Sequence, residues 1–145
     1  MATEGDVIKQ IEKFAGTWKQ IRCDNIDAFF KEMGLNYLLR KIASQANPEV
    51  EILINGVDIQ ISFKTPFRAE CMKYKLNEEV EIETQKGKFK ATTTYESGKL
   101  ISKQVPIQGN DAKPMVSERE INVAGELVTT IYVGDVVCVR IFTKL

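Results

Sequence analysis

The sequence of 145 residues predicts an all-β protein, in the form of a meandering antiparallel barrel or sandwich with one early pair of helices. Three observations predict this class. About ten short segments alternate apolar and polar residues, as half-buried strands do. Turn-forming residues such as Gly, Asn and Asp separate these segments. The clearest helical spacing of apolar residues is confined to residues 25–45.

A helical segment interrupts the strands early in the chain. The first expected strand covers residues 14–23, and residues 25–45 follow with apolar side chains at helical spacing. Asp24 or Asn25 can cap the first turn, and Gly34 breaks the helical pattern. This segment is therefore expected to fold as a short helix, a turn and another short helix.

Alternation with period two dominates the rest of the chain, and Asn55-Gly56 between two alternating runs predicts a tight hairpin. Some strands are polar on both faces, as at Thr92-Thr93-Thr94, which favours a wet interior. A closed sheet of about ten strands can hold solvent or a ligand, since side chains alone fill barrels of about eight strands. The strands after the helices are expected at residues 50–54, 57–63, 68–75, 80–84, 88–95, 99–105, 115–122, 127–133 and 136–143.

Two arginines fall on strand faces that should be buried. Because side chains alternate along a strand, Arg140 shares its face with Val136, Cys138 and Phe142, and Arg119 lies on a similar face upstream. Arginine is rarely buried without a partner, since removing its charge from water costs several kcal/mol. The pair predicts an internal site for an anion of carboxylate size. The alternative is two surface arginines in ordinary salt bridges.

Composition excludes several classes of function. Twenty basic and twenty acidic residues balance without a basic run, so nucleic-acid binding is not expected. No signal-peptide pattern or membrane-spanning stretch occurs, which favours an intracellular protein of one domain, residues 1–145. The three cysteines are far apart, and the chain has no histidine and no nucleotide-binding or nucleophile motif. An enzyme, a metal site and a cofactor are therefore not expected.

A series of short motifs occurs in order along residues 14–145. They are Phe14-Ala15-Gly16-Thr17-Trp18-Lys19, Asn25-Ile26-Asp27-Ala28-Phe29-Phe30-Lys31, Thr65-Pro66-Phe67-Arg68, Arg119-Glu120 and Gly134-Asp135-Val136-Val137-Cys138 with Arg140-Ile141-Phe142. In order and spacing they resemble the intracellular lipid-binding protein family, the cytosolic fatty-acid-binding and retinoid-binding proteins. The resemblance implies a ten-stranded antiparallel up-and-down barrel, or clam, with a helix-turn-helix lid between the first and second strands. It also implies a water-containing cavity for one long-chain lipid.

The resemblance assigns the carboxylate of a fatty acid to Arg119 and Arg140. Many relatives carry a tyrosine where this chain has Phe142, which cannot donate a hydrogen bond, so Arg119 is expected to take the leading role. Gln104 corresponds to a polar position of the lumen, with exposure at the surface as the alternative. Lid and portal positions expected to touch the lipid tail are Ile26, Phe29, Phe30, Leu35, Ala43 and Phe67. Ordinary core packing is the alternative for the helical ones.

The resemblance also bears on partners and location. Lys31, Arg40 and Lys41 match a basic patch that serves nuclear import in an adipocyte-type relative, although scattered basic residues on a helix usually just contact solvent. The expected protein is a monomeric cytoplasmic carrier with a possible nuclear role, through a nuclear receptor or import factor, and with transient membrane contact through the lid. A retinoid carrier and a filled-barrel interaction module are the alternatives. Residues 1–13 form an N-terminal extension, either a short amphipathic helical turn or a frayed tail.

Overall fold

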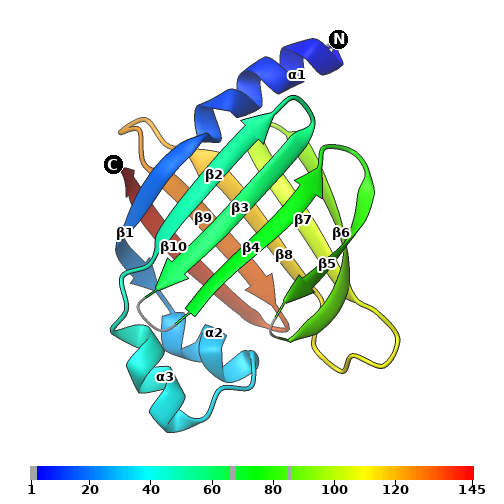
Figure 1. Cartoon of the computed structure of the whole chain (residues 1–145). Coiled ribbons are helices and arrows are strands. Elements are labelled where there is room, and N and C mark those ends of the chain that lie inside the picture. Colours follow the sequence, from blue (N-terminus) through cyan, green and yellow to red (C-terminus); the bar gives the residue numbers. More distant parts are fainter. Residues whose placement is uncertain (1–2, 66–67, 85) are drawn as a thin grey trace.

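The computed structural model describes residues 3–65, 68–84 and 86–145, which form ten strands and three α-helices (Figure 1). The helices are α1 (Glu4–Ile11), α2 (Ile26–Glu32) and α3 (Tyr37–Ser44), and a 3-10 turn covers Glu12–Phe14. The strands are β1 (Gly16–Asp24), β2 (Glu49–Asn55), β3 (Asp58–Thr65), β4 (Arg68–Lys75), β5 (Glu79–Thr84), β6 (Gly87–Glu96), β7 (Lys99–Pro106), β8 (Met115–Ile121), β9 (Leu127–Val133) and β10 (Val136–Lys144).

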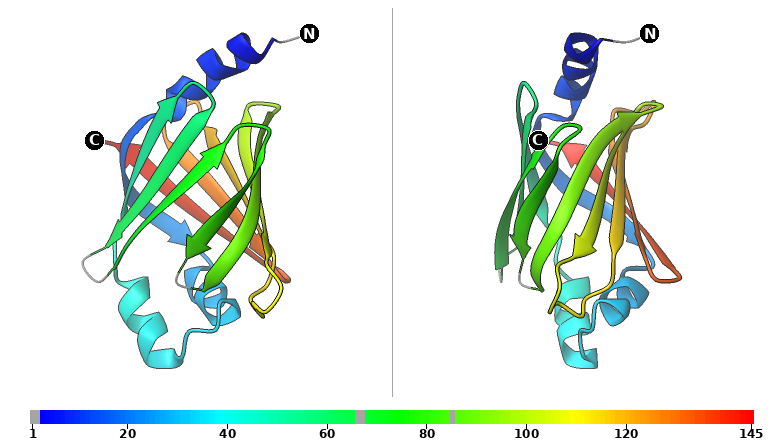
Figure 2. Two further views of the ribbon diagram at one scale, coloured as in Figure 1. Left: turned by 45° about the vertical axis from the view of Figure 1, so that its right-hand side comes forward. Right: turned by 90° about the vertical axis from the view of Figure 1, so that its right-hand side faces the viewer.

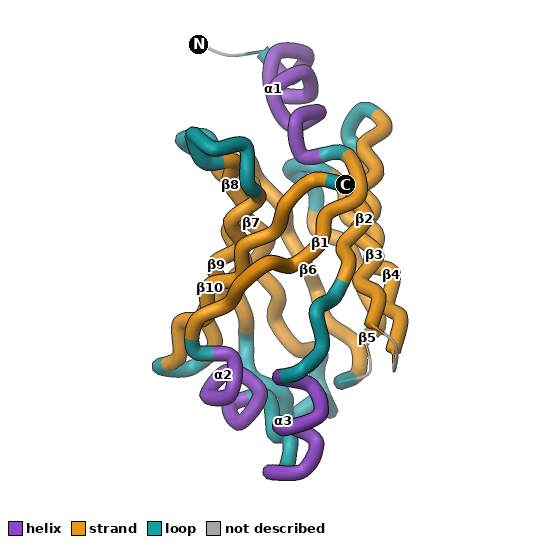
Figure 3. The backbone as a smooth tube through the Cα atoms, turned by 90° about the vertical axis from the view of Figure 1, so that its left-hand side faces the viewer, coloured by secondary structure: helices purple, strands orange, loops and turns teal. Residues whose placement is uncertain are grey.

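All ten strands belong to one antiparallel sheet with the order β4-β3-β2-β1-β10-β9-β8-β7-β6-β5. The first and last strands pair with each other, so the sheet curls into a nearly closed barrel (Figures 2 and 3). At the edges β4 and β5, isolated bridges join Lys75 to Glu78, just before β5, and Leu76 to Thr93 on β6. The up-and-down barrel and the lid between the first and second strands are thus confirmed.

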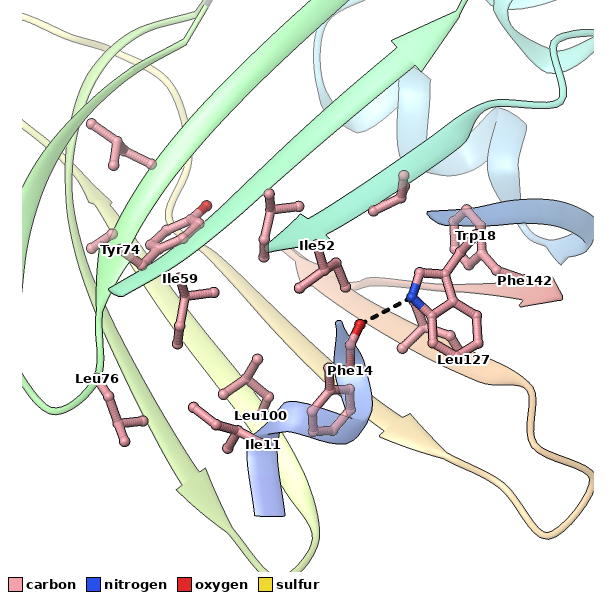
Figure 4. Close-up of a cluster of buried hydrophobic side chains, with 14 of the residues drawn as sticks. Ile11, Phe14, Trp18, Ile52, Ile59, Tyr74, Leu76, Leu100, Leu127 and Phe142 are labelled. Carbon is pink, nitrogen blue, oxygen red and sulfur yellow. Dashed lines mark hydrogen bonds between the residues drawn. The ribbon is translucent and has the colours of Figure 1, made fainter. Parts of the chain in front are cut away.

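Helices lie at both ends of the barrel. Figures 1 and 2 show α2 and α3 at one end and α1 at the opposite end. A capping box between Thr3 and Asp6 begins α1, which is a helix and not a frayed tail. Ile11 and Phe14 behind it have 0% exposure and join the main core (Figure 4). The chain that leads into β1 therefore contributes to the interior of the barrel.

Three local expectations were wrong. Phe14 does not begin the first strand: it ends the 3-10 turn, and its carbonyl accepts a hydrogen bond of 3.0 Å from Trp18 Nε1 (Figure 4). Asn25 precedes α2 in the left-handed region with φ 65°, and its side chain donates to the Val137 carbonyl and does not cap the helix. The β2–β3 hairpin turns one residue later than expected, with the positive φ at Gly56.

Candidate functional site

The register of three neighbouring strands places both arginines on one row. Arg119 on β8 lies opposite Thr129 on β9, which lies opposite Arg140 on β10. Directly opposed residues point to the same face, and this face is the interior, where Thr129 and Arg140 are buried. Since strands lie about 4.8 Å apart, the two arginine Cα atoms are about 10 Å apart. The interior of the barrel therefore carries two neighbouring cations.

Arg140 has two neutral partners, Gln20 and Phe63, among the residues that the structure describes. It is 6% exposed, and its Nε donates to Gln20 Oε1 at 2.7 Å. The guanidinium carbon also lies 5.1 Å from the centroid of the Phe63 ring, which is a cation–π distance. In the pairing of β1 with β10, Gln20 lies opposite Phe142, and both side chains point to the interior. Burial lowers the pKa of Arg140, although a guanidinium stays charged in proteins.

Arg119 is in a different position. Among the residues that the structure describes, its Nη1 is the one buried side-chain nitrogen or oxygen without a hydrogen-bond partner. Burial lowers the pKa of Arg119, and the nearby Tyr74 opposes this shift. A buried donor on a charged group costs free energy when it has no acceptor. Arg119 is thus prepared to bind an acceptor, and an anion would be the most favourable one.

A tyrosine and a glutamine accompany Arg119 in the interior. Tyr74 on β4 is 3% exposed, and its hydroxyl donates to Gln104 Oε1 on β7 at 3.2 Å. Met72 Sδ is a second, weaker acceptor at 3.3 Å. Burial raises the pKa of Tyr74 to about 12, opposed by Arg119 and reinforced by Glu70. The phenol of Tyr74 is therefore neutral. Gln104 is buried, in agreement with the interior position expected for it.

Tyr74 was not among the site residues predicted from the sequence. It alternates with Met72 and Leu76 on one strand face, which makes its ring an ordinary core side chain. Its hydroxyl is the feature of the sequence that could have indicated a site residue, because a buried phenol needs a hydrogen-bond partner. Gln104 and Tyr74 are thirty residues apart in the chain, so only the closed barrel brings them together.

The raised pKa of Tyr74 predicts a specific loss of stability at high pH. The unfolded phenol ionises near pH 10 and the folded one near pH 12, so the folded state holds more protons between these values. The contribution of the phenol to the free energy of unfolding is complete below pH 10 and is lost by pH 12. Wild type should lose roughly 2 kcal/mol more than Tyr74→Phe between pH 9.5 and pH 11.5. Urea unfolding at pH 9.5 and 11.5 measures the difference, and equal losses would contradict the prediction.

Phe142 is a residue of the hydrophobic core. Its side chain is buried with Trp18 and Leu127 in the main cluster (Figure 4). Cys138, two residues before Arg140 in the chain, is also buried. Burial raises the pKa of its thiol to about 11, and the charge of Arg140 opposes this increase. All three cysteines are free. The neighbours of Arg140 are therefore neutral groups and not a counter-charge.

A cavity of about 610 Å³ opens where the chain enters β1, beside Ala15 and Gly16. Its lining combines the inward-facing Ile52, Ile59 and Tyr74 with exposed residues such as Leu53 and Lys73. Its volume lies within the range of about 300–1,000 Å³ that small-molecule sites occupy. The arginines do not line this cavity, but Tyr74 does, and its hydroxyl reaches Gln104 on the far wall. Tyr74 therefore connects this cavity with the polar side chain of Gln104.

The lid residues fall into two groups. Phe29 is buried, and Ile26 and Phe30 are partly buried, in a second core cluster with inward-facing residues of β9 and β10 such as Ile131. This packing agrees with the alternative of ordinary core residues, and their contact with a lipid tail stays a prediction. Leu35 and Ala43 are half-buried. The predicted portal residue Phe67 lies outside the described residues.

The three residues of the predicted basic patch are not equivalent. Lys31 and Lys41 are exposed. Arg40 is engaged, since its Nε lies 3.0 Å from Asp27 Oδ1 and its Nη1 donates to the Leu35 carbonyl at 3.0 Å. Lys41 Nζ also lies 5.3 Å from the centroid of the Tyr37 ring, so Arg40 and Lys41 both have partners within the lid.

The described part of the chain contains no helix that is long and apolar enough to cross a membrane. Within the same residues, no group of three or more His, Cys, Asp or Glu side chains is arranged to hold a metal ion.

Comparison with known proteins identifies the family. Residues 15–144 match the lipocalin / cytosolic fatty-acid binding protein family. The chain is 36% identical to mouse cellular retinoic acid-binding protein 2 and 32% identical to fatty acid-binding protein homolog 5 of Caenorhabditis elegans. These alignments cover 90% and 92% of this chain and 97% of each relative. The chain belongs to the lipocalin / cytosolic fatty-acid binding protein family, and the resemblance found in the sequence is confirmed.

Solved structures agree with this assignment. Apo lipid binding protein 8 of Caenorhabditis elegans superposes with a TM-score of 0.85 at 28% identity, over 93% of this chain and 97% of that one. The fatty acid binding protein of Schistosoma mansoni, solved in complex with arachidonic acid, gives a TM-score of 0.81 at 26% identity, over 94% and 98% of the two chains. The fold of this family of lipid-binding proteins therefore extends over nearly the whole chain.

Proposed function

We propose that the protein is a non-catalytic carrier that binds one long-chain fatty acid inside its barrel, with the carboxylate held by Arg119 and Arg140. The observation that carries this proposal is the buried Nη1 of Arg119, which has no acceptor among the described residues. A guanidinium can bind a carboxylate through two parallel hydrogen bonds and is charged at every cellular pH. The carrier would solubilise and transport its lipid in the cytoplasm.

Tail and head group have different roles in this proposal. Burial of an acyl chain gains about 0.8 kcal/mol for each methylene, before the costs of ordering and immobilisation. Apolar residues such as Ile52 and Ile59 supply the surface for the tail. The arginines select an anionic head group, because a neutral lipid would leave the buried cation of Arg119 unpaired. Affinity therefore comes mainly from the tail and selectivity from the head group.

Delipidated protein is expected to take up one equivalent of a fluorescent fatty acid, and oleate should displace it. Solvent extraction of the purified protein, followed by mass spectrometry, would identify the lipid that it acquires in the cell. Absence of uptake would contradict the carrier and favour the alternative, an interaction module with a filled barrel. Release of a neutral lipid alone would contradict the role of the arginines.

A retinoid carrier is the second candidate. Its support is the 36–38% identity to cellular retinoic acid-binding proteins, which exceeds the 32% identity to the fatty acid-binding protein homolog. Retinoic acid also carries a carboxylate, so the arginines suit both ligands. Competition between retinoic acid and oleate for the delipidated protein decides between them, and tighter binding of retinoic acid would replace the fatty-acid assignment.

We propose that the lid makes transient contact with membranes and that it supports a role in the nucleus. Helix α3 supports the first part because it has no buried residue. Its exposed apolar side chains are Tyr37, Leu38, Leu39 and Ile42.

The proposed nuclear role depends on Lys31, Arg40 and Lys41. If a nuclear receptor or an import factor recognises these residues, alanine at all three positions should lower the nuclear fraction of the lipid-loaded protein about severalfold, as charge-dependent recognition requires. Imaging of a tagged protein measures this fraction. Alanine at Lys90 and Lys103 is the control, since both are exposed lysines on β6 and β7 and do not line the cavity. Unchanged nuclear abundance of the triple variant would exclude the patch.

A further inference from the structure

The two interior arginines differ in what they still need. Arg140 already donates to Gln20 and lies over the ring of Phe63. Arg119 keeps a buried donor, Nη1, without an acceptor among the described residues. An incoming anion therefore gains more binding free energy at Arg119, because there it supplies the acceptor that the buried donor lacks. At Arg140 it would have to replace the hydrogen bond with Gln20.

Tyr74 offers a second donor in the interior. Its ring lines the cavity and its hydroxyl crosses the barrel to Gln104. Gln104 pairs with Met115 on β8, the strand that carries Arg119, and Tyr74 and Arg119 each shift the pKa of the other. A lipid with its tail in the cavity and its head at Arg119 would pass this hydroxyl. A carboxylate offers about four acceptor positions, more than one guanidinium uses.

We propose that Tyr74 is a ligand-binding residue that determines specificity, and that its phenol donates a hydrogen bond to the carboxylate bound by Arg119. This inference rests on the proposed function as a carrier of an anionic lipid. On the side of Arg119, the site then consists of this cation, one neutral donor and Gln104 as a supporting amide, with Arg140 as the second cation across Thr129. A neutral donor adds a strong hydrogen bond to an anion without adding a second buried charge.

The Tyr74–Gln104 pair can exchange roles when the ligand binds. In the empty barrel the single phenol hydrogen is donated to Gln104 Oε1. When the carboxylate arrives, the hydroxyl rotates toward it, and a flip of the side-chain amide presents Gln104 Nε2 to the phenol oxygen. The two ends of an amide occupy the same volume, so this flip needs no repacking. The phenol then keeps its hydrogen bond with Gln104 and gains one to the carboxylate.

Removal of one oxygen atom tests this role. Isothermal titration of the delipidated protein should show oleate binding about tenfold more weakly to Tyr74→Phe than to wild type, as expected for a lost hydrogen bond to a charged group. Methyl oleate should bind both proteins equally. Tyr132→Phe is the matched control, because the hydroxyl of Tyr132 faces Glu118 at 3.4 Å on an exposed part of the sheet. This control should bind oleate like wild type.

A measurement on the wild type gives a readout that does not depend on how the variant folds. The chain has four tyrosines, so labelling with carbon-13 at the phenolic carbon gives four resonances. One of them, absent in spectra of Tyr74→Phe, should shift with oleate and move much less with methyl oleate.

Several outcomes would overturn the inference. Unchanged oleate affinity in Tyr74→Phe would exclude the contact, and equal losses for oleate and its methyl ester would make the hydroxyl merely structural. Four unshifted phenolic resonances on saturation with oleate would also exclude it. If the wild type itself bound no anionic lipid, the proposed function would fail together with the role of Tyr74. If wild type and Tyr74→Phe bound oleate equally well, only the proposed role of Tyr74 would be overturned.

Discussion

Replacement of Arg119 by methionine is expected to weaken oleate binding about 100-fold, while methyl oleate should bind almost as before. Methionine keeps an unbranched chain in the barrel and removes the charge, so the apolar surface offered to the tail changes little. The carboxylate then loses its main partner in a medium of low dielectric constant. Isothermal titration with both ligands measures the two affinities. Equal losses for oleate and its ester would show that Arg119 acts on the tail or on the fold.

The same substitution should make the empty protein more stable. Nη1 of Arg119 is buried without an acceptor among the described residues, so the folded apo state carries a cost that the unfolded chain does not. Its removal should raise the free energy of unfolding by about 1–3 kcal/mol. Stability given up at a binding site for the sake of function is a common compromise in proteins.

Lys103→Met is the control for the expected gain in stability of the empty protein. Lys103 lies on β7 and is exposed, so its replacement should alter neither stability nor binding appreciably. Urea unfolding of the delipidated proteins measures the difference. Destabilisation by Arg119→Met would mean that the guanidinium stabilises the empty barrel and has an acceptor of its own.

The second large effect concerns the N-terminal extension. Ile11→Ala is expected to lower the free energy of unfolding by about 3 kcal/mol, because it removes a fully buried side chain and leaves a cavity. Thermal and urea unfolding measure this loss. Val123→Ala is the matched control, since Val123 is fully exposed at 110% and should cost less than about 0.5 kcal/mol. A similarly small effect at Ile11 would mean that α1 is not packed in solution.

This result bears on the domain organisation. The family match begins at residue 15, so α1 lies outside the region that the chain shares with the family. Ile11 nevertheless belongs to the same core cluster as Trp18 and Leu100 (Figure 4). We propose that residues 1–145 form one lipid-binding domain in which residues 1–13 are an extension that completes the core.

Much of the fold could be predicted from the sequence, because a strand carries its pattern locally. Alternation with period two places Val136, Cys138, Arg140 and Phe142 on one face, and three of these four residues are buried. The same alternation applied to residues 115–121 placed Arg119 on the inner face. Local patterns were less successful at boundaries such as Phe14 and Asn25, where distant partners decide the geometry.

The state of each arginine could not be predicted in this way, because partners from distant strands determine it. Gln20 reaches Arg140 only because β1 pairs with β10 and places Gln20 opposite Phe142. Tyr74 approaches Gln104 and the neighbourhood of Arg119 only because the sheet closes. The sequence by itself determined that each arginine shares a strand face with apolar residues, since a side chain's face depends on its own strand. Only the tertiary structure decided that Arg140 is satisfied and Arg119 is not, since hydrogen bonds depend on what stands across the barrel.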